Sequence, residues 1–482
     1  MSYSIHQLLV KSEEKLVKIL NSFAEDPTRM AEMVGGIQSI MTEIGCEIIA
    51  SELNELDKII RNIPERKRSW SVVRRDENSL LTTIGTVQYE KTLFINKKTG
   101  ERTYLLDRMM GLEAHARMTE DVEARILAEA VGSSYGKGGI QASITEETVS
   151  KQTVKNKIHE LEFPLEEVTQ KEKKVKPVLY IDADEDHVSL QGEGKENTIS
   201  KLIYLYEGRE PETPKSDRYK LTEVRYFGGL YHGSKQNEEL WNEVREYIES
   251  SYEADQIQKI YVNGDGGGWI KAGIKQLTKA ELVLDGYHLE KELTRATSHL
   301  ADTASQVKET IRKILKEGNR QELQEYFDRI LDATEEEKWE KVTEVRNYLM
   351  ENFKGARNRL SKKEEILGSS TEGHISHVYS ERLSSRPLSW SLIGADKMSK
   401  LRVYYFNGGD MLELVRYQKR AIREKEEACI LNLRQIINEE KAQRRKLGCF
   451  AGIKTYSVGP QISKILWMKD HICSLLINVH VL

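Results

Sequence analysis

Acidic side chains interrupt a run of strand-forming residues near the middle of the chain, over residues 176–191. Tyr180 and Ile181 have the character of a buried strand, and Asp182 and Asp184 follow them directly. Burying a carboxylate without a partner is unfavourable, so acids in such a strand need a cation or a basic neighbour. The pattern therefore favours a divalent metal site. The alternative is a hairpin that turns at these acids and leaves them in solvent.

A second acid, Asp265, follows a short apolar strand and precedes three consecutive glycines. The pattern predicts three strands, a helix and another strand at residues 176–191, 201–206, 219–231, 237–252 and 257–262. This is the order of a ribonuclease-H-like fold, in which two acids meet at the ends of neighbouring central strands. The glycines let the backbone turn sharply and let a metal or a phosphate approach closely. A plain strand-to-helix turn with a capping aspartate is the alternative.

Asp285 and His288 follow a further strand at residues 282–284, where Asp285 can equally be a helix N-cap and His288 a surface residue. Residues 289–367 are almost all helix formers, which is too long for one crossover and predicts a helical insertion. A new helix is expected to begin at residues 370–372, capped by a serine or threonine, and to end at a proline.

The N-terminal part of the chain carries candidate DNA contacts. Residues 1–62 have helical periodicity, and a basic cluster around Trp70 follows them. Such a cluster can bind phosphates while the tryptophan stacks on a base, although a solvated linker with a packed tryptophan fits equally well. The cluster residues proposed to contact DNA are Arg66, Lys67, Arg68, Trp70, Arg74 and Arg75.

A β-hairpin and a helix-turn-helix are expected next. Residues 82–107 alternate in polarity around a turn at Asn96 to Gly100, which predicts the hairpin. Residues 143–161 resemble a helix-turn-helix whose second helix is capped by Ser150, or else hold an ordinary charged surface helix. Its candidate contacts to DNA are Lys151, Gln152, Thr153, Lys155, Asn156 and Lys157, with Arg382 and Arg386 adding positive charge further along the chain.

Bulk properties suit a cytosolic protein of several domains. The chain has 482 residues, 39% of them hydrophobic, and a net charge of −4. No run looks long enough to span a membrane and the N-terminus lacks a signal peptide's apolar core, so a cytoplasmic protein without membrane contact is expected. The four cysteines have no paired metal-ligand spacing, which favours reduced thiols.

Four motifs together resemble the DDE transposases of bacterial insertion sequences, and more narrowly their ISLre group, an uncharacterised protein family of the UPF series. The motifs are YIDADEDHVSLQ, YVNGDGGGWI, LDGYHLEKEL and STEGHISHVYSERLSSRPLSW, and the likeness covers nearly the whole chain. The third motif is similar to the Asp/Cys-x-x-His element that Mutator-like transposases place before a helical insertion. The tail beyond about Gly448 departs from the family pattern.

The resemblance implies which residues do the chemistry. Asp184 and Asp265 would bind two divalent ions, and Glu372 would complete the site. Asp182 is an alternative to Asp184, because positions two apart on a strand face the same way. Glu381 is the corresponding alternative to Glu372. As accessory residues, Asp285 and His288 would position DNA or the scissile phosphate.

The resemblance also implies a function, a transposase that cleaves and joins DNA with two Mg²⁺ ions, for which Mn²⁺ can substitute. Its partners would be double-stranded DNA, both terminal repeats and target, and at least one further copy of the chain. A ribonuclease-H-like nuclease that cuts without joining is one alternative. A catalytically inactive DNA-binding relic is another.

The expected fold class is α/β, with a ribonuclease-H-like core of mixed sheet flanked by helices. An all-helical insertion interrupts the core, and a mainly helical DNA-binding region with the hairpin and the helix-turn-helix precedes it. The expected regions are a helical N-terminal region (1–62), a DNA-binding region (63–165), the first part of the core (177–288), the insertion (289–367), the second part of the core (368–447) and an unassigned tail (448–482).

Overall fold

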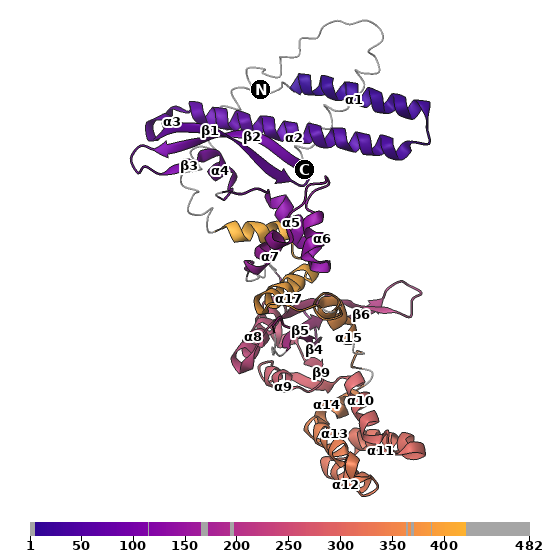
Figure 1. Cartoon of the computed structure of the whole chain (residues 1–482). Coiled ribbons are helices and arrows are strands. Elements are labelled where there is room, and N and C mark those ends of the chain that lie inside the picture. Colours follow the sequence, from indigo (N-terminus) through magenta and orange to yellow (C-terminus); the bar gives the residue numbers. More distant parts are fainter. Residues whose placement is uncertain are drawn as a thin grey trace. The chain divides into compact units, whose positions relative to one another are not determined.

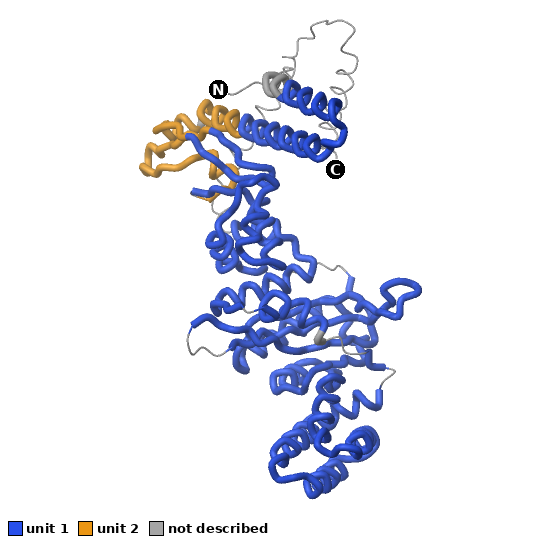
Figure 2. Tube along the Cα trace, turned by 45° about the vertical axis from the view of Figure 1, so that its right-hand side comes forward, with its two compact units in different colours: residues 1–52, 77–89, 115–421 blue, residues 53–76, 90–114, 422–482 orange. Residues whose placement is uncertain are grey.

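The structure is a computed structural model that describes residues 5–113, 115–164, 172–192, 197–362, 365–367, 371–386 and 388–420. The chain divides into two compact units (Figure 2). Unit 1 holds residues 1–52, 77–89 and 115–421, and unit 2 holds residues 53–76, 90–114 and 422–482. The predicted tail at 448–482 and the helices expected at 421–446 lie outside the described residues.

The chain begins with two long helices, α1 (Ile5–Glu25) and α2 (Met30–Asn62), as the periodicity predicts. Residues 30–52 of α2 belong to unit 1 and the remainder to unit 2. By length and composition alone α2 could cross a membrane, because an 18-residue window has a mean hydropathy of 1.2 with 6% of it buried. The expectation that no run is long enough to span a membrane is therefore not met by α2.

Unit 2 continues from α2 into α3 (Pro64–Ser69), the start of β1 (Trp70–Thr82), the end of β2 (Gly85–Asn96), β3 (Arg102–Tyr104) and α4 (Leu105–Met110). The strands form a sheet in the order β1-β2-β3. β2 and β3 pair antiparallel, with Leu93 opposite Tyr104, so the predicted hairpin and its turn are confirmed. Pro64 opens α3, where the missing N–H of proline costs no helical hydrogen bond.

Three short helices follow in unit 1: α5 (Glu120–Gly132), α6 (Tyr135–Ile140) and α7 (Lys151–His159). Ser150 caps α7 as predicted, since its hydroxyl accepts a hydrogen bond from the Thr153 N–H at 3.1 Å. The first helix expected within residues 143–161 is absent, because residues 141–150 form turns and loop. The helix that precedes α7 is α6 instead, and a helix-turn-helix is not established.

The central sheet of unit 1 is mixed and has the strand order β10-β9-β4-β5-β8. Its strands are β4 (Val178–Val188), β5 (Thr198–Tyr206), β8 (Arg225–Gly229), β9 (Lys259–Gly264) and β10 (Ala280–Leu284). β4, β5 and β8 pair antiparallel as the predicted meander, while β9 lies parallel to β4 and β10 parallel to β9. β4 runs straight through its acids, so the alternative hairpin turn is excluded. A small hairpin of β6 (Gly208–Pro211) and β7 (Tyr219–Thr222) interrupts the meander.

Helices cover both faces of this sheet (Figure 1). On one face, α8 (Gly233–Ser251) and α9 (Gly268–Ile274) pack through Trp241 and Ile270 onto Ile181 and Ala183. On the other face, α17 (Leu392–Phe406) and a helix that starts at Thr371 pack onto Tyr204 and the other alternate strand residues. Because strand side chains alternate, Asp182 and Asp184 belong to this second face.

The stretch predicted as a helical insertion is helical and has its own apolar core. It comprises α10 (Gly286–Thr297), α11 (Ala304–Glu317), α12 (Arg320–Asp332), α13 (Trp339–Glu351) and α14 (Phe353–Ser361), with 3-10 turns at 301–303 and 336–338. α14 packs against β10. The chain then forms one helical stretch from α15 (Thr371–Ile375) through a π-helical segment (Ser376–Ser380) to α16 (Glu381–Leu383), and Pro387 lies outside the described residues.

Candidate functional site: an acidic edge of the central sheet

Three aspartates lie at one edge of the sheet, where β9 and β10 end beside the middle of β4. Asp182 of β4 pairs with Asn263 of β9, so Asp184 and Asp265 both come two residues beyond this pair. β10 ends opposite Gly264, and the N–H of Asp285 donates to the Gly264 carbonyl at 2.8 Å. Asp184 within β4, Asp265 just after β9 and Asp285 just after β10 thus come from three adjacent strands, an arrangement called here the acidic edge.

Asp184 is an acid in an environment that disfavours its charge. Burial, with smaller contributions from the nearby Asp265 and Asp285, raises the pKa of Asp184 to about 6. The Glu185 N–H, which donates to Asp184 Oδ1 at 2.8 Å, and the neighbouring His288 act in the opposite direction. A cation at the acidic edge would relieve both the burial and the repulsion.

Asp265 is held by a tight loop that the insertion supports. Its Oδ1 accepts from the Gly267 N–H at 2.7 Å, and the Tyr348 hydroxyl of α13 donates to its backbone carbonyl at 2.7 Å. Gly266 has φ of 82°, and a Cβ there would come within 2.2 Å of Asn352 Oδ1. The glycine is therefore needed both for its backbone conformation and for the close approach of the insertion.

Asp285 and His288 form a pair at the start of α10. Asp285 Oδ2 accepts from the N–H groups of Tyr287 and His288, so the capping interpretation of Asp285 is confirmed. His288 Nδ1 lies 3.3 Å from the same oxygen, and this interaction raises the pKa of His288. The capping role does not exclude a second one, because both side chains act electrostatically on Asp184.

Asp182, the alternative to Asp184, has a different environment. Its side chain is fully buried and accepts hydrogen bonds from the Tyr204 hydroxyl at 2.7 Å, the Tyr206 hydroxyl at 3.1 Å and Asn263 Nδ2 at 2.5 Å. Arg359 of α14 extends this closed network, since its Nη2 donates to Asn263 Oδ1 at 2.7 Å. A carboxylate enclosed in this way is stabilised by the protein itself, so Asp184 is the better metal-ligand candidate.

The backbone of Glu372 lies in α15, which packs against β4, whereas its side chain is outside the described residues. Two residues later, His374 stacks on Tyr204 with ring centroids 4.3 Å apart, and its Nδ1 lies 2.8 Å from the Tyr226 hydroxyl. Burial lowers the pKa of His374 to about 4, which keeps the ring neutral. The alternative, Glu381, is 63% exposed and lies 3.8 Å from His377.

Among the described side chains, no group of three or more histidine, cysteine, aspartate or glutamate residues has the geometry of a metal site. The chemistry of the acidic edge nevertheless fits a hard divalent cation, which prefers carboxylate oxygens. Asp184 and Asp265 supply such oxygens and act on each other electrostatically, and a bound cation would favour the ionised form of Asp184.

The basic cluster of unit 2 corrects two expectations. Trp70 and Arg66 are both buried, at 8% exposure each, so neither offers a surface to DNA. Arg66 donates to the backbone carbonyls of Ile60 and Trp70 and is a structural residue. On β1, Arg74 is paired with Asp76 and Arg75 with Glu90. On α3, Lys67 and Arg68 are exposed.

The second basic group also divides into exposed and structural residues. On α7, Lys151, Gln152 and Asn156 are exposed, while Thr153 and Lys155 are half-buried and Lys157 lies 3.3 Å from Glu123. Arg382 is buried, donates to the Ala130 carbonyl and lies over the ring of Trp390, so its expected contact with DNA is not supported. Arg386 is exposed.

Sequence reasoning missed the network under the acidic edge. Tyr204 and Tyr206 alternate along β5 opposite β4, and this spacing in KLIYLY was the available signal that both hydroxyls face Asp182. The roles of Asn263, Tyr348 and Arg359 had no such signal, because they depend on how strands and the insertion meet.

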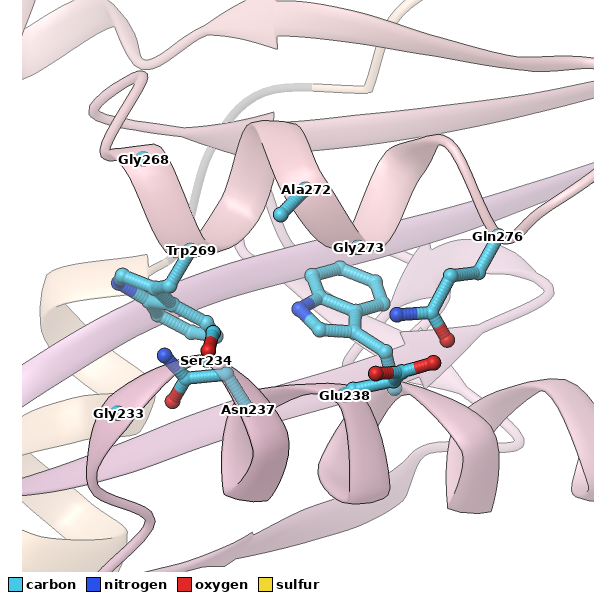
Figure 3. A pocket seen from close by; sticks show the side chains of 10 residues that line it. Gly233, Ser234, Asn237, Glu238, Gly268, Trp269, Ala272, Gly273 and Gln276 are labelled. Atoms are coloured by element: carbon cyan, nitrogen blue, oxygen red, sulfur yellow. The ribbon is translucent and has the colours of Figure 1, made fainter.

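A separate pocket of about 520 Å³ lies between the first turns of α8 and α9 (Figure 3). Ser234, Asn237 and Glu238 line it from α8, and Trp269 and Gln276 from α9 and the residues that follow it. None of the three aspartates of the acidic edge lines it. The acidic edge and the pocket are therefore distinct features.

The fold and the site define a mixed α/β protein with an acidic edge on its central sheet and a helical insertion beside it. The chain belongs to the Uncharacterised protein family (UPF0236), whose profile matches residues 23–421.

Relatives of known sequence come from Caldanaerobacter subterraneus subsp. tengcongensis. One UPF0236 protein is 38% identical over 402 residues, which is 83% of each chain, and its name joins four locus designations. Another is 37% identical over 401 residues, again 83% of each chain, and its name joins eleven locus designations. The Drosophila P element transposase strand transfer complex is similar at 10% identity and a TM-score of 0.22, covering 64% of this chain and 82% of that one. Similarity at that level does not define a shared fold.

Proposed function

We propose that this protein is a DNA transposase that cleaves the ends of an insertion sequence and joins them to target DNA. The observation that carries the proposal is the acidic edge, where Asp184 within β4 and Asp265 just after the parallel β9 interact electrostatically. Paired carboxylates at such an edge suit divalent ions over a phosphodiester.

The strand order supports a ribonuclease-H-like core. Three antiparallel strands, β4, β5 and β8, are followed by α8 and by β9, which returns to lie parallel beside β4. The first acid then sits on the central strand and the second just beyond its parallel neighbour, as the proposed chemistry requires.

Each residue of the site has a distinct task in the proposed reaction. When bound, two Mg²⁺ ions would activate the attacking hydroxyl and stabilise the leaving oxygen, with Mn²⁺ able to replace them. Asp184 and Asp265 would hold the ions, and Glu372 from α15 would complete the set. The Gly267 N–H fixes the orientation of Asp265. His288, whose pKa is raised by Asp285, holds a proton that can bind a phosphate oxygen.

DNA would be bound through exposed basic and polar residues. Lys67 and Arg68 on α3, and Lys151, Gln152 and Asn156 on α7, are exposed and suit phosphates and base edges. Arg386 adds a further exposed cation. Such a protein would act in the bacterial cytoplasm, at the nucleoid.

The names of the relatives give independent support. One UPF0236 protein carries eleven locus designations from a single genome, and another carries four. A gene present in many copies within one genome is what a mobile element produces as it spreads.

The test uses the full chain, Mg²⁺ and labelled duplexes taken from the DNA that flanks its gene. Cleavage at the gene's boundary followed by joining of pre-cleaved ends to a plasmid supports the proposal. Cleavage without joining would identify a nuclease, and DNA binding without either step a relic. Asp265→Asn should abolish both steps at unchanged DNA affinity, while the exposed Asp255→Asn should leave them intact and serves as the matched control.

A further inference from the structure

The N-terminal half of α2 carries an apolar stripe that is exposed among the residues that the structure describes. Met30, Val34, Met41 and Ile48 are 51%, 54%, 62% and 38% exposed. Ile37 and Ile44 lie between them and are partly exposed. Large apolar side chains in a contiguous exposed row mark an interaction surface rather than ordinary solvent contact.

The spacing of this stripe is that of a coiled coil. From Met30 through Val34, Ile37, Met41 and Ile44 to Ile48, the steps are four, three, four, three and four residues. Steps of this kind keep apolar side chains on one seam facing a partner helix. The pattern spans almost three heptads, so the seam requires a helical partner of matching pattern.

α1 cannot be that partner, because it already contacts a different side of α2. A Cβ at Gly36 would meet Ile19 of α1 at 2.6 Å, and Lys15 pairs with Glu43. α1 extends the same apolar face. Its exposed residues Val17 and Leu20 lie two positions before and one position after Ile19, and Val34 and Ile37 of α2 have the same positions relative to Gly36. In an antiparallel helix pair, equal offsets from the contact turn side chains to the same side.

We propose that this face is a dimerisation surface, on which the α2 stripe of one copy pairs with the α2 stripe of a second copy. The positions beside the stripe on the side away from α1 are Ala31, Gln38 and Gly45, which are small or uncharged. On the side toward α1 the flanking positions are Met33, Ile40 and Glu47, of which only Glu47 is charged. Two identical stripes therefore meet with one charge per helix beside them, at one end of the stripe.

A lipid bilayer fits this surface less well than a second copy does. α2 satisfies the length and composition of a membrane span, but a spanning helix would bury Glu43 and Glu47 in hydrocarbon. Both acids lie on the part of the helix that also carries the stripe. The dimer leaves them in water, where Glu43 already pairs with Lys15.

Light scattering on the full chain tests the proposal without DNA or catalysis. At tens of micromolar, the wild type should have twice the 55.5 kDa mass of one chain, and the double variant Val34→Glu, Met41→Glu should fall to that single mass. Ser39→Glu places the same charge on an exposed position outside the stripe and should remain a dimer. A wild-type monomer, or a dimer that survives the double variant, would overturn the proposal.

Cysteine cross-linking gives a second test that does not depend on a disruptive variant. In a chain whose four native cysteines are changed to serine, Met41→Cys should form a disulfide between copies, because residue 41 lies near the middle of the stripe. Ser39→Cys should not. Equal cross-linking of the two variants contradicts the proposed seam, and so does flotation of the wild-type chain with phosphatidylcholine vesicles.

Discussion

Asp182 and Asp184 lie two residues apart on the same face of β4, yet their environments are opposite. Asp182 is fully buried and receives three hydrogen bonds from Tyr204, Tyr206 and Asn263. Asp184 receives one backbone hydrogen bond, and burial beside two other acids raises its pKa to about 6. The closed network stabilises the charge of Asp182 with hydrogen bonds from the protein. The acidic edge leaves the charge of Asp184 without such stabilisation, which a bound cation can supply. One strand thus carries an acid suited to stability and an acid suited to binding.

The largest expected effect is on activity at the acidic edge. Asp184→Asn and Asp265→Asn keep the shape of the side chain but remove the charge, so DNA cleavage should fall by about 10³-fold or more, about 4 kcal/mol of barrier. Initial cleavage rates on flanking-DNA duplexes measure this. Asp255→Asn is the control, and retention of wild-type rates by Asp184→Asn would show that the acidic edge is not the catalytic site.

The next effect is on stability in the closed network. Asp182→Ala should lower the free energy of unfolding by about 3 kcal/mol, because two buried hydroxyls and an amide lose their acceptor. Asp184→Asn should lower the free energy of unfolding only slightly or raise it. Urea titration of the three proteins measures the contrast, and equal losses for both variants would remove the distinction between the two acids.

Arg359 connects the network to the insertion and should have an intermediate effect. It donates to the Leu284 carbonyl at 2.8 Å and to Asn263 Oδ1 at 2.7 Å, so it joins the ends of β10 and β9. Arg359→Ala should cost about 2 kcal/mol of stability, and Arg359→Lys should not restore it because an ammonium does not reproduce the fork. Full recovery by lysine in thermal melts would contradict this geometry.

The smallest effect is the pH dependence of stabilisation by Mg²⁺. Because the folded-state pKa of Asp184 is raised to about 6, its favourable contribution is present at low pH and is lost as pH rises from about 4 through 6. Mg²⁺ competes with this proton, so the Mg²⁺-induced rise in Tm should be larger at about pH 7.5 than at about pH 5. Scanning calorimetry measures it. Asp184→Asn should abolish the difference, and a pH-independent shift in the wild type would exclude Asp184 as the ligand.

The order of elements could be predicted from sequence because local patterns determine it. The alternation in β4 and β5, the amphipathic α8 and the helix formers after Asp285 each indicate their own structure. The distinction between Asp182 and Asp184 could not be predicted, since both share one face of one strand. It depends on Tyr204 and Asn263, which neighbouring strands bring into contact with Asp182 alone.

The basic residues show the same limit. Trp70 and Arg382 have the residue types of DNA contacts, but both are buried against the protein's own backbone and rings. Composition gives the number of cations in a segment and not which of them the fold already uses. The absence of a helix at residues 143–149 has a similar cause, because the Ser143 hydroxyl bonds to the Thr145 hydroxyl and to the Thr83 carbonyl rather than opening a helix.

Anomalous diffraction from crystals of the full chain grown with Mn²⁺ tests the central claim most directly. The account predicts a manganese peak within bonding distance of carboxylate oxygens of both Asp184 and Asp265, with Asp182 still enclosed by its tyrosines. A peak bound to Asp182, or manganese bound only away from the acidic edge, would contradict it.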